Sequence, residues 1–320
     1  MSDLVPIVVF VYKRENHTRK LLESLAGCEL ADESKLIIYS DGAKKPQDEK
    51  DIVRVRELVH EKKWQEKFAG IEFVEATNNK GLANSIIGGV TDVIGKYGKV
   101  IVLEDDLEVA PGFLKYMNEM LDSQKDNPKV FSIAGWTYPF CTGAKDGNKN
   151  NDKNNAPWYF YRACSWGWAT WSDRWEKVEF DPVIADYEGK LANSKWCEKF
   201  SRGGNDLPGM LQLYLDGKID SWAIRWNAAS SDLDMMTVYS SGRILRCNGL
   251  DGTGTNCSDR EDSTEEAAEF NRLTEAMEPI DNVNYIKKAW KYESDTLSKK
   301  IKRNLRVIFV EHKVPQFLKR

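Results

Sequence analysis

A short apolar run that ends in three acidic residues is the feature that most constrains the fold of this chain. Residues 100–103 are apolar at every position, which predicts a strand buried on both faces of a sheet. Glu104, Asp105 and Asp106 follow at once, and Pro111 then opens a stretch with apolar residues at helical spacing. In open α/β sheets, ligands bind beyond the carboxyl ends of the strands. We therefore expect the three carboxylates at a ligand-binding edge.

The acidic triplet predicts a cation site. Adjacent carboxylates repel one another, and a hard divalent cation, Mn²⁺ or Mg²⁺, held by one or two carboxylates and by substrate phosphates, would neutralise them. A solvated acidic turn is the alternative, because acids are common in loops. The position directly after an apolar strand favours the metal site.

Three earlier apolar runs repeat the strand-to-helix pattern. Residues 6–12, 35–40 and 71–75 are rich in β-branched and aromatic side chains and are each followed by a helical pattern. Four strands alternating with helices over residues 5–106 predict a parallel sheet with crossover helices.

Polar residues follow each of these predicted strands. Arg14 follows the first, where a guanidinium can grip a diphosphate or a base, although a solvated helix-entry arginine explains it equally well. Asp41 follows the second and precedes a glycine, which by itself indicates only a turn. Asn79, Lys80 and Gly81 follow the third, and the helix that begins there would favour anions at its amino end.

Composition bounds the class of protein. The chain has 320 residues, 41% hydrophobic and 30% charged, which is typical of a globular protein with one large or two small domains. The formal net charge of −4 argues against general nucleic-acid binding. No apolar run is long enough to span a bilayer, there is no signal-peptide pattern, and the six cysteines form no CxxC pair. We expect a cytoplasmic protein with reduced thiols.

Aromatic residues are dense over residues 158–175. Hydrophobic core is one interpretation. The other is a wall for the acceptor sugar, for which Trp166, Gly167 and Trp168 are the candidates.

The C-terminal region is basic. Residues 287–320 contain eleven Lys or Arg and three Asp or Glu, interspersed with apolar residues. A basic amphipathic helix can lie on an anionic membrane, and an ordinary charged packing helix is the alternative. Contact of residues 285–320 with the inner face of a membrane is therefore a hypothesis.

The segment LEDDLEVAP resembles the metal- and nucleotide-sugar-binding segment of GT-A glycosyltransferases, most closely that of N-acetylglucosaminyltransferase I and its bacterial relatives. The resemblance covers roughly residues 5–260. It implies that Asp106 is the metal ligand of a DXD-type motif and that Glu104 and Asp105 contact ribose and sugar. It also implies that Asp41 contacts the uracil ring and that Arg14 contacts the nucleotide.

The same resemblance extends to other segments. Residues 79–81 match the family's Asn-x-Gly-Leu-Ala step, and residues 166–168 match a segment that lines the donor and acceptor sites. Asp206 precedes a helix where relatives carry a general base, but Asn205 stands where its acidic partner usually lies. Asp206 can also simply cap that helix, and Asp220 is the reserve candidate. In the loop at residues 249–257, Asn256 stands where relatives carry a histidine.

Together these features predict an α/β protein of GT-A type, with a mostly parallel doubly wound sheet, helices on both faces and a helical C-terminal extension. The expected domains are residues 1–262, with a nucleotide-binding half at 1–135 and an acceptor half at 136–262, and a basic extension at 263–320. The expected activity is inverting, metal-dependent transfer of a sugar, GlcNAc by resemblance, from a UDP-sugar to a glycan or lipid-linked acceptor in bacterial polysaccharide biosynthesis. A sugar nucleotidyltransferase and a non-catalytic carbohydrate-binding protein are the alternatives.

Overall fold

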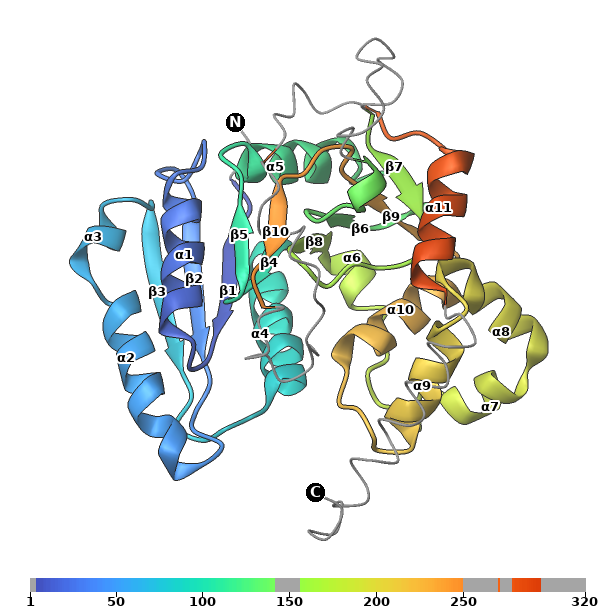
Figure 1. Cartoon of the computed structure of the whole chain (residues 1–320), viewed down its shortest axis with the longest axis horizontal. Coiled ribbons are helices and arrows are strands. Elements are labelled where there is room, and N and C mark those ends of the chain that lie inside the picture. The colour runs from blue at the N-terminus through green and yellow to red at the C-terminus, as the bar shows by residue number, and fades with distance from the viewer. Residues whose placement is uncertain (1–3, 142–155, 250–269, 271–277, 295–320) are drawn as a thin grey trace, which may run out of the picture.

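The computed structural model describes residues 4–141, 156–249, 270 and 278–294. Its centre is an eight-stranded sheet with the order β3-β2-β1-β4-β8-β6-β9-β7 (Figure 1). The strands are β1 (Ile7–Val11), β2 (Lys35–Ser40), β3 (Gly70–Glu75), β4 (Lys99–Glu104), β6 (Val130–Ala134), β7 (Trp158–Phe160), β8 (Trp168–Trp171) and β9 (Met236–Tyr239).

The sheet is mostly parallel. Strands β1 to β4 pair in parallel, and β6 pairs in parallel with β9. Strand β8 lies antiparallel between β4 and β6, and β7 lies antiparallel to β9 at the edge. The parallel half predicted from the alternation of strands and helices is confirmed. A separate two-stranded antiparallel sheet pairs β5 (Leu107–Val109) with β10 (Leu245–Cys247).

Strand β4 is buried on both faces, as its uniform apolar sequence predicts. Ile101 and Leu103 point into one hydrophobic cluster, whereas Val100 and Val102 point into the other. The first cluster includes buried residues of α1 (Glu15–Ala26), α2 (Glu49–Val59) and α5 (Phe113–Ser123). The second includes α4 (Leu82–Tyr97) and α10 (Trp222–Asp232). Helices therefore cover both faces, which confirms the doubly wound architecture.

Smaller helices complete the described part of the chain. They are η1 (Pro46–Asp48), α3 (Lys62–Gln65), η2 (Pro139–Cys141), α6 (Ser172–Trp175), α7 (Tyr187–Ala192), α8 (Ser194–Phe200), η4 (Ser201–Gly203), α9 (Leu207–Leu215) and α11 (Val283–Glu293). Helices α7, α8 and α9 share a third hydrophobic cluster with α10.

Helix α11 packs on the body of the protein. Ala289 is fully buried in the larger cluster, Trp290 Nε1 donates to the Ser201 carbonyl at 2.8 Å, and Ile280 bridges to Trp158 of β7. The expected extension at 263–320 thus contributes a segment that is continuous with the sheet edge, while residues 263–269, 271–277 and 295–320 lie outside the described residues. Within the described part of the chain, no helix has the length and apolarity to cross a membrane.

Candidate functional site

The parallel strands β1 to β4 all end at one edge, at the bottom of Figure 1. The register pairs Phe10 of β1 with Glu104 of β4, so the chain leaves both strands at the same level. This is why Arg14, 90 or more positions away from the acidic triplet in the sequence, lies beside it.

Arg14 connects two of the three acids. Its Nη2 donates to Asp105 Oδ1 and to Asp106 Oδ2, the latter at 3.0 Å. Burial alone would lower the pKa of Arg14, but the charges and hydrogen bonds of Asp105 and Asp106 outweigh it and raise that pKa. Its Nη1 is buried and has no hydrogen-bond partner among the described residues. A buried guanidinium N–H without a partner is costly, and a ligand oxygen placed beside it would satisfy it.

The surroundings of Glu104 disfavour its charged form. Burial raises its pKa to about 8, the negative charges of Asp106 and Asp105 add to the rise, and Arg14 offsets only part of it. Burial, with the charge of Asp106, likewise raises the pKa of Asp105 despite the opposing charge and hydrogen bond of Arg14. One guanidinium facing three carboxylates leaves an excess of negative charge that a bound cation would neutralise.

The surroundings of Asp106 fit a metal held by few protein ligands. Its Oδ1 receives no hydrogen bond from the described residues, and the backbone of Gly249 lies so close that a β-carbon there would sit 2.1 Å from Oδ2. Within the described ranges, no three His, Cys, Asp or Glu side chains are grouped as a metal site. One carboxylate with substrate phosphates and water is nevertheless an ordinary Mg²⁺ arrangement. Asn256 lies outside the described residues.

The second and third strand ends meet at Asp41. Its carboxylate accepts hydrogen bonds from the backbone N–H groups of Gly42, Lys80 and Gly81 and from the Asn79 side chain, at 2.8 to 3.0 Å. The structure thus brings together all four of the predicted nucleotide contacts in this region. Four hydrogen bonds fill the acceptor capacity of a carboxylate. Asp41 therefore holds the loop that leads into α4.

Asp206 is part of a closed ion network. Its two carboxylate oxygens accept from Arg162 Nη1 and Nη2 at 2.9 and 3.0 Å, and Glu293 of α11 lies 3.5 Å from Arg162 Nε. Tyr138 donates to Glu293 at 2.8 Å, and Asp206 is only 7% exposed. Sequence reasoning missed Arg162 and Glu293, because nothing local marks an arginine in an aromatic stretch or an acid in a basic tail as partners.

Asp220 lies at the same edge as the acidic triplet. Trp222 at the start of α10 contacts Trp168, which pairs with the carboxyl-terminal ends of β4 and β6, with ring centroids 5.2 Å apart. Trp226 further along α10 contacts Phe131 near the start of β6, at 4.0 Å. Helix α10 therefore begins at the carboxyl edge. Asp220, two residues before it, is exposed there.

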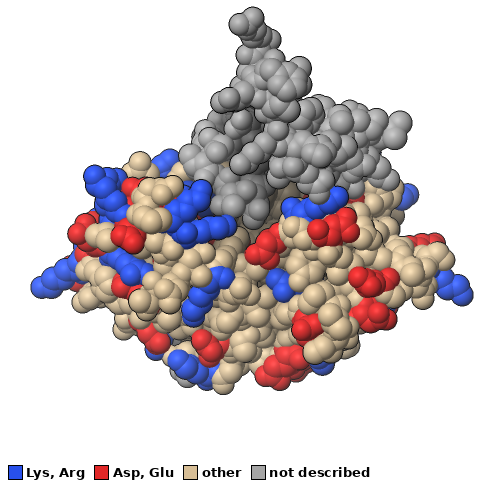
Figure 2. Space-filling model, turned by 90° about the horizontal axis from the view of Figure 1, so that it is seen from below, with Lys and Arg blue, Asp and Glu red and all other residues tan. Residues whose placement is uncertain are grey.

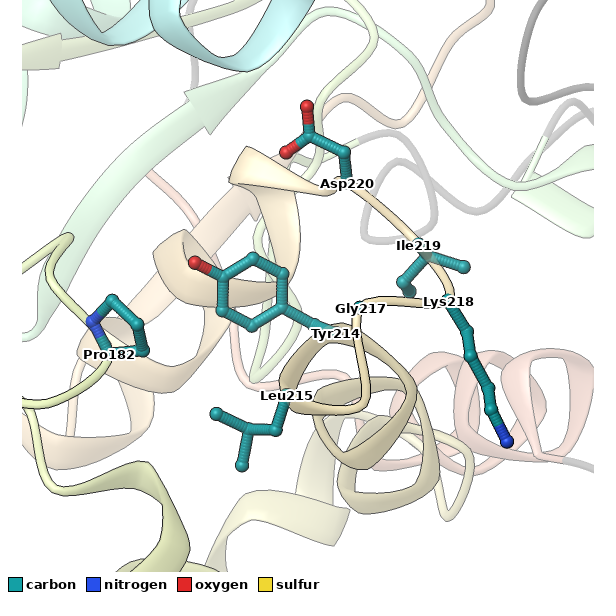
Figure 3. A pocket seen from close by; sticks show the side chains of 7 residues that line it. All are labelled: Pro182, Tyr214, Leu215, Gly217, Lys218, Ile219 and Asp220. Atoms are coloured by element: carbon teal, nitrogen blue, oxygen red, sulfur yellow. The ribbon is translucent and has the colours of Figure 1, made fainter.

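A pocket of about 340 Å³ adjoins Asp220 (Figure 3). It is formed by the end of α9, by the loop that connects α9 to α10, and by the chain before α7. Its lining residues are Pro182, Tyr214, Leu215, Gly217, Lys218, Ile219 and Asp220.

The prediction that Trp168 contacts the acceptor sugar is wrong. Trp168 is 1% exposed and packs on Trp175, Trp222 and Trp226, so it is a core residue. The core interpretation of the aromatic stretch holds here because β8 inserts between β4 and β6.

The other two members of the predicted sugar wall differ from each other. Gly167 is buried and adopts a φ of +59°, and a β-carbon there would lie 2.2 Å from Leu245. Trp166 is partly exposed and packs edge-on against Trp136, with ring centroids 5.2 Å apart. Of the three residues, only Trp166 keeps surface that a ligand could contact.

Comparison with known proteins gives a sequence relative and several structural ones. No family model matches the chain. The chain is 24% identical over 182 residues to an α-1,3-mannosyl-glycoprotein 2-β-N-acetylglucosaminyltransferase of Arabidopsis thaliana, which covers 49% of this chain and 38% of the relative. The chain thus spans well under half the length of this relative. The relative confirms the resemblance that was stated from the sequence.

The comparison with solved structures gives matches with TM-scores below 0.5. The chain is similar to residues 1–349 of S. aureus TarS (TM-score 0.41, 11% identity, 74% of this chain and 58% of that one). It is also similar to the mannosyltransferase PcManGT of Pyrobaculum calidifontis in complex with GDP-Man and Mn²⁺ (0.38, 11%, 72% and 70%). The third is GalNAc-T7 with UDP, GalNAc and Mn²⁺ (0.43, 10%, 75% and 43%).

Proposed function

We propose that this protein is a divalent-metal-dependent glycosyltransferase that moves a sugar, with inversion, from a UDP-sugar to a hydroxyl of a glycan or lipid-linked acceptor. One observation carries the proposal. Three carboxylates at the end of the buried strand β4 face an arginine at the end of β1 that keeps one buried N–H without a partner. This combination suits a ligand that brings both a cation and phosphate oxygens.

The donor would bind at the ends of β1 and β4. Asp106 would hold Mn²⁺ or Mg²⁺, and the bound ion would stabilise the negative charge of the departing diphosphate. Arg14 would donate its free N–H to the nucleotide, and Glu104 and Asp105 would accept from ribose or sugar hydroxyls. The loop at residues 79–81, which Asp41 holds through the backbone N–H groups of Lys80 and Gly81, would lie beside the donor. UDP-GlcNAc is the preferred donor on resemblance.

Inversion requires one general base that takes the proton of the acceptor hydroxyl. Both oxygens of Asp206 already accept from Arg162, and the side chain is only 10% exposed, so an acceptor hydroxyl has little access to it. Asp220 is exposed, adjoins a pocket and lies at the carboxyl edge. We therefore assign the base to Asp220 and give Asp206 a structural part.

Calorimetry with UDP, with and without Mn²⁺, tests the donor site. The wild type should bind UDP only with the metal, and Asp106→Ala should abolish that binding. Asp51→Ala, which removes an exposed acid on α2, is the control and should bind as the wild type does. Absence of metal-dependent UDP binding in the wild type would contradict the proposal and would favour a carbohydrate-binding protein.

Turnover and membrane contact need separate measurements. A screen of UDP-, GDP- and dTDP-sugars for Mn²⁺-dependent donor hydrolysis identifies the donor, and NMR of the product anomer tests inversion.

A lipid-linked acceptor would place the enzyme at the cytoplasmic face of a membrane, through residues 285–320. Co-sedimentation with anionic liposomes should then fall when the chain is ended at Asp295, and equal sedimentation of both chains would remove that part of the proposal.

A further inference from the structure

An aliphatic tip stands beside the pocket that adjoins Asp220. Val183 and Ile184 are 84% and 73% exposed, more than any other large apolar side chain of the described residues. They directly follow Pro182, which lines the pocket and faces the ring of Tyr214 (Figure 3). We call these two residues the aliphatic tip.

The turn that carries the tip is fixed. Asp181 Oδ1 accepts the backbone N–H groups of Val183 and Ile184 at 2.8 and 3.2 Å, and its carbonyl accepts from Ala185 at 2.9 Å. The backbone is therefore already ordered without a ligand. Covering the tip would cost little further backbone entropy.

The tip adjoins the pocket along the chain, because Val183 directly follows Pro182 of the pocket lining. The pocket contributes Pro182, Tyr214, Leu215 and Ile219, and its volume of about 340 Å³ lies within the range of small-molecule sites. Apolar side chains that adjoin a concave site in this way indicate a contact with an apolar part of a ligand. Asp220 stands in the same lining and is the polar group that would meet a hydroxyl.

The charges around this surface limit the kind of ligand that it can bind. Residues 177–188 and 214–220 together contain six Asp or Glu and two Lys. Figure 2, which views the molecule from below, shows acidic side chains gathered on the right, where helices α7 to α9 lie in Figure 1. An anionic membrane surface would be repelled here. The acidic surroundings thus disfavour an anionic ligand, and a molecule with a hydroxyl-bearing end and an apolar end matches the lining.

We propose that the pocket and the aliphatic tip bind the acceptor, and that this acceptor carries an uncharged apolar aglycone. The sugar hydroxyl lies at Asp220, the pyranose lies against the Tyr214 ring, and the aglycone runs across Pro182 onto Val183 and Ile184. The inference rests on the proposed function, because it takes the pocket as the acceptor side of a transferase.

Saturation-transfer NMR on the full chain measures the dissociation constants directly. The probes are the methyl and octyl β-glycosides of glucose, galactose, mannose and N-acetylglucosamine, below their critical micelle concentrations and in the presence of UDP and Mn²⁺. For at least one sugar, the octyl glycoside should bind at least about tenfold more tightly than the methyl glycoside, because several methylenes leave water.

The double variant Val183→Ser with Ile184→Ser should reduce that ratio to about twofold without a change in melting temperature, since both side chains are exposed. Val53→Ser, which changes a 52% exposed valine on α2, should keep the full ratio. Equal binding of octyl and methyl glycosides by the wild type, or an undiminished ratio in the double variant, would overturn the proposal. So would a wild-type dimer that the double variant converts to a monomer in sedimentation velocity, because a second copy would then cover the tip.

Failure of the proposed function gives a different pattern. If the octyl preference depends on the tip but calorimetry finds no metal-dependent UDP binding, the apolar site stands and the transferase proposal falls. If UDP binds with Mn²⁺ but the octyl preference is absent, the transferase proposal stands and the aglycone site falls.

Discussion

Replacing Asp206 and Asp220 separately by asparagine distinguishes a structural acid from a catalytic one. In Asp206→Asn, Arg162 loses a bidentate partner in a site where the two side chains are only 10% and 15% exposed. Breaking a buried pair from one side costs about 3–5 kcal/mol. Glu293 still lies 3.5 Å from Arg162 and asparagine keeps one acceptor oxygen, so we expect about 2–3 kcal/mol. That corresponds to a fall in melting temperature of about 3–6 °C for a chain of this length.

Asp220→Asn should behave in the opposite way. The side chain is exposed, so the free energy of unfolding should change by less than about 0.5 kcal/mol. Loss of a general base should lower kcat by about 10²- to 10⁴-fold with metal-dependent UDP binding unchanged. Thermal unfolding, calorimetry and transfer assays on both variants separate the two roles, with Asp216→Asn on the same loop as the control.

The outcome that refutes this reasoning is specific. If Asp206→Asn keeps the wild-type melting temperature and UDP binding but loses transfer, while Asp220→Asn transfers normally, the base is Asp206. The Arg162 contact would then have to open when the acceptor binds.

Three further predictions test the rest of the site. Asp41→Asn replaces one carboxylate oxygen by an NH₂ group, which would face N–H groups such as those of Asn79 and Lys80. The variant should therefore weaken metal-dependent UDP binding about 5- to 30-fold in calorimetry, whereas the control Asp51→Asn should not. Gly249→Ala drives a β-carbon against the Asp106 carboxylate and should weaken Mn²⁺-dependent UDP binding at least about tenfold, and unchanged affinity would show that the loop is free to move. Trp168→Ala should lower stability by about 3–5 kcal/mol in denaturant unfolding, whereas Trp166→Ala should cost far less and act on transfer; equal losses of stability would place both in the core.

The first half of the fold could be predicted because its signals are local. Each parallel strand is a continuous apolar run followed by a helix, and a buried strand such as β4 needs no knowledge of its neighbours to be recognised. The insertion of β8 between β4 and β6 could not be predicted, since antiparallel pairing of Lys99 with Trp171 depends on contacts far apart in sequence. That insertion is what turns Trp168 from an expected sugar contact into core.

The candidate site, like the fold, could be predicted only in part. Strand ends in a parallel sheet meet at one edge whatever the loops do, so the acidic triplet, Arg14 and Asp41 could be placed together from the pattern alone. What each side chain does there could not be predicted. Asp41 follows a strand and Asp206 precedes a helix, and only their partners show that each accepts hydrogen bonds within the protein.

The two arginine networks show why the ligand is expected at one of them. Arg14 and Arg162 each face carboxylates from distant segments, and each is held charged by them. Arg162 donates to Gly203 and to both oxygens of Asp206, and no nitrogen of its side chain is both buried and without a partner. Arg14 contacts Asp105 and Asp106 but leaves Nη1 buried without a partner among the described residues. Because a folded protein rarely leaves such a donor unpaired, we expect a ligand to complete the open network at β1 and β4, whereas the closed network at Arg162 holds α11 to the body of the protein.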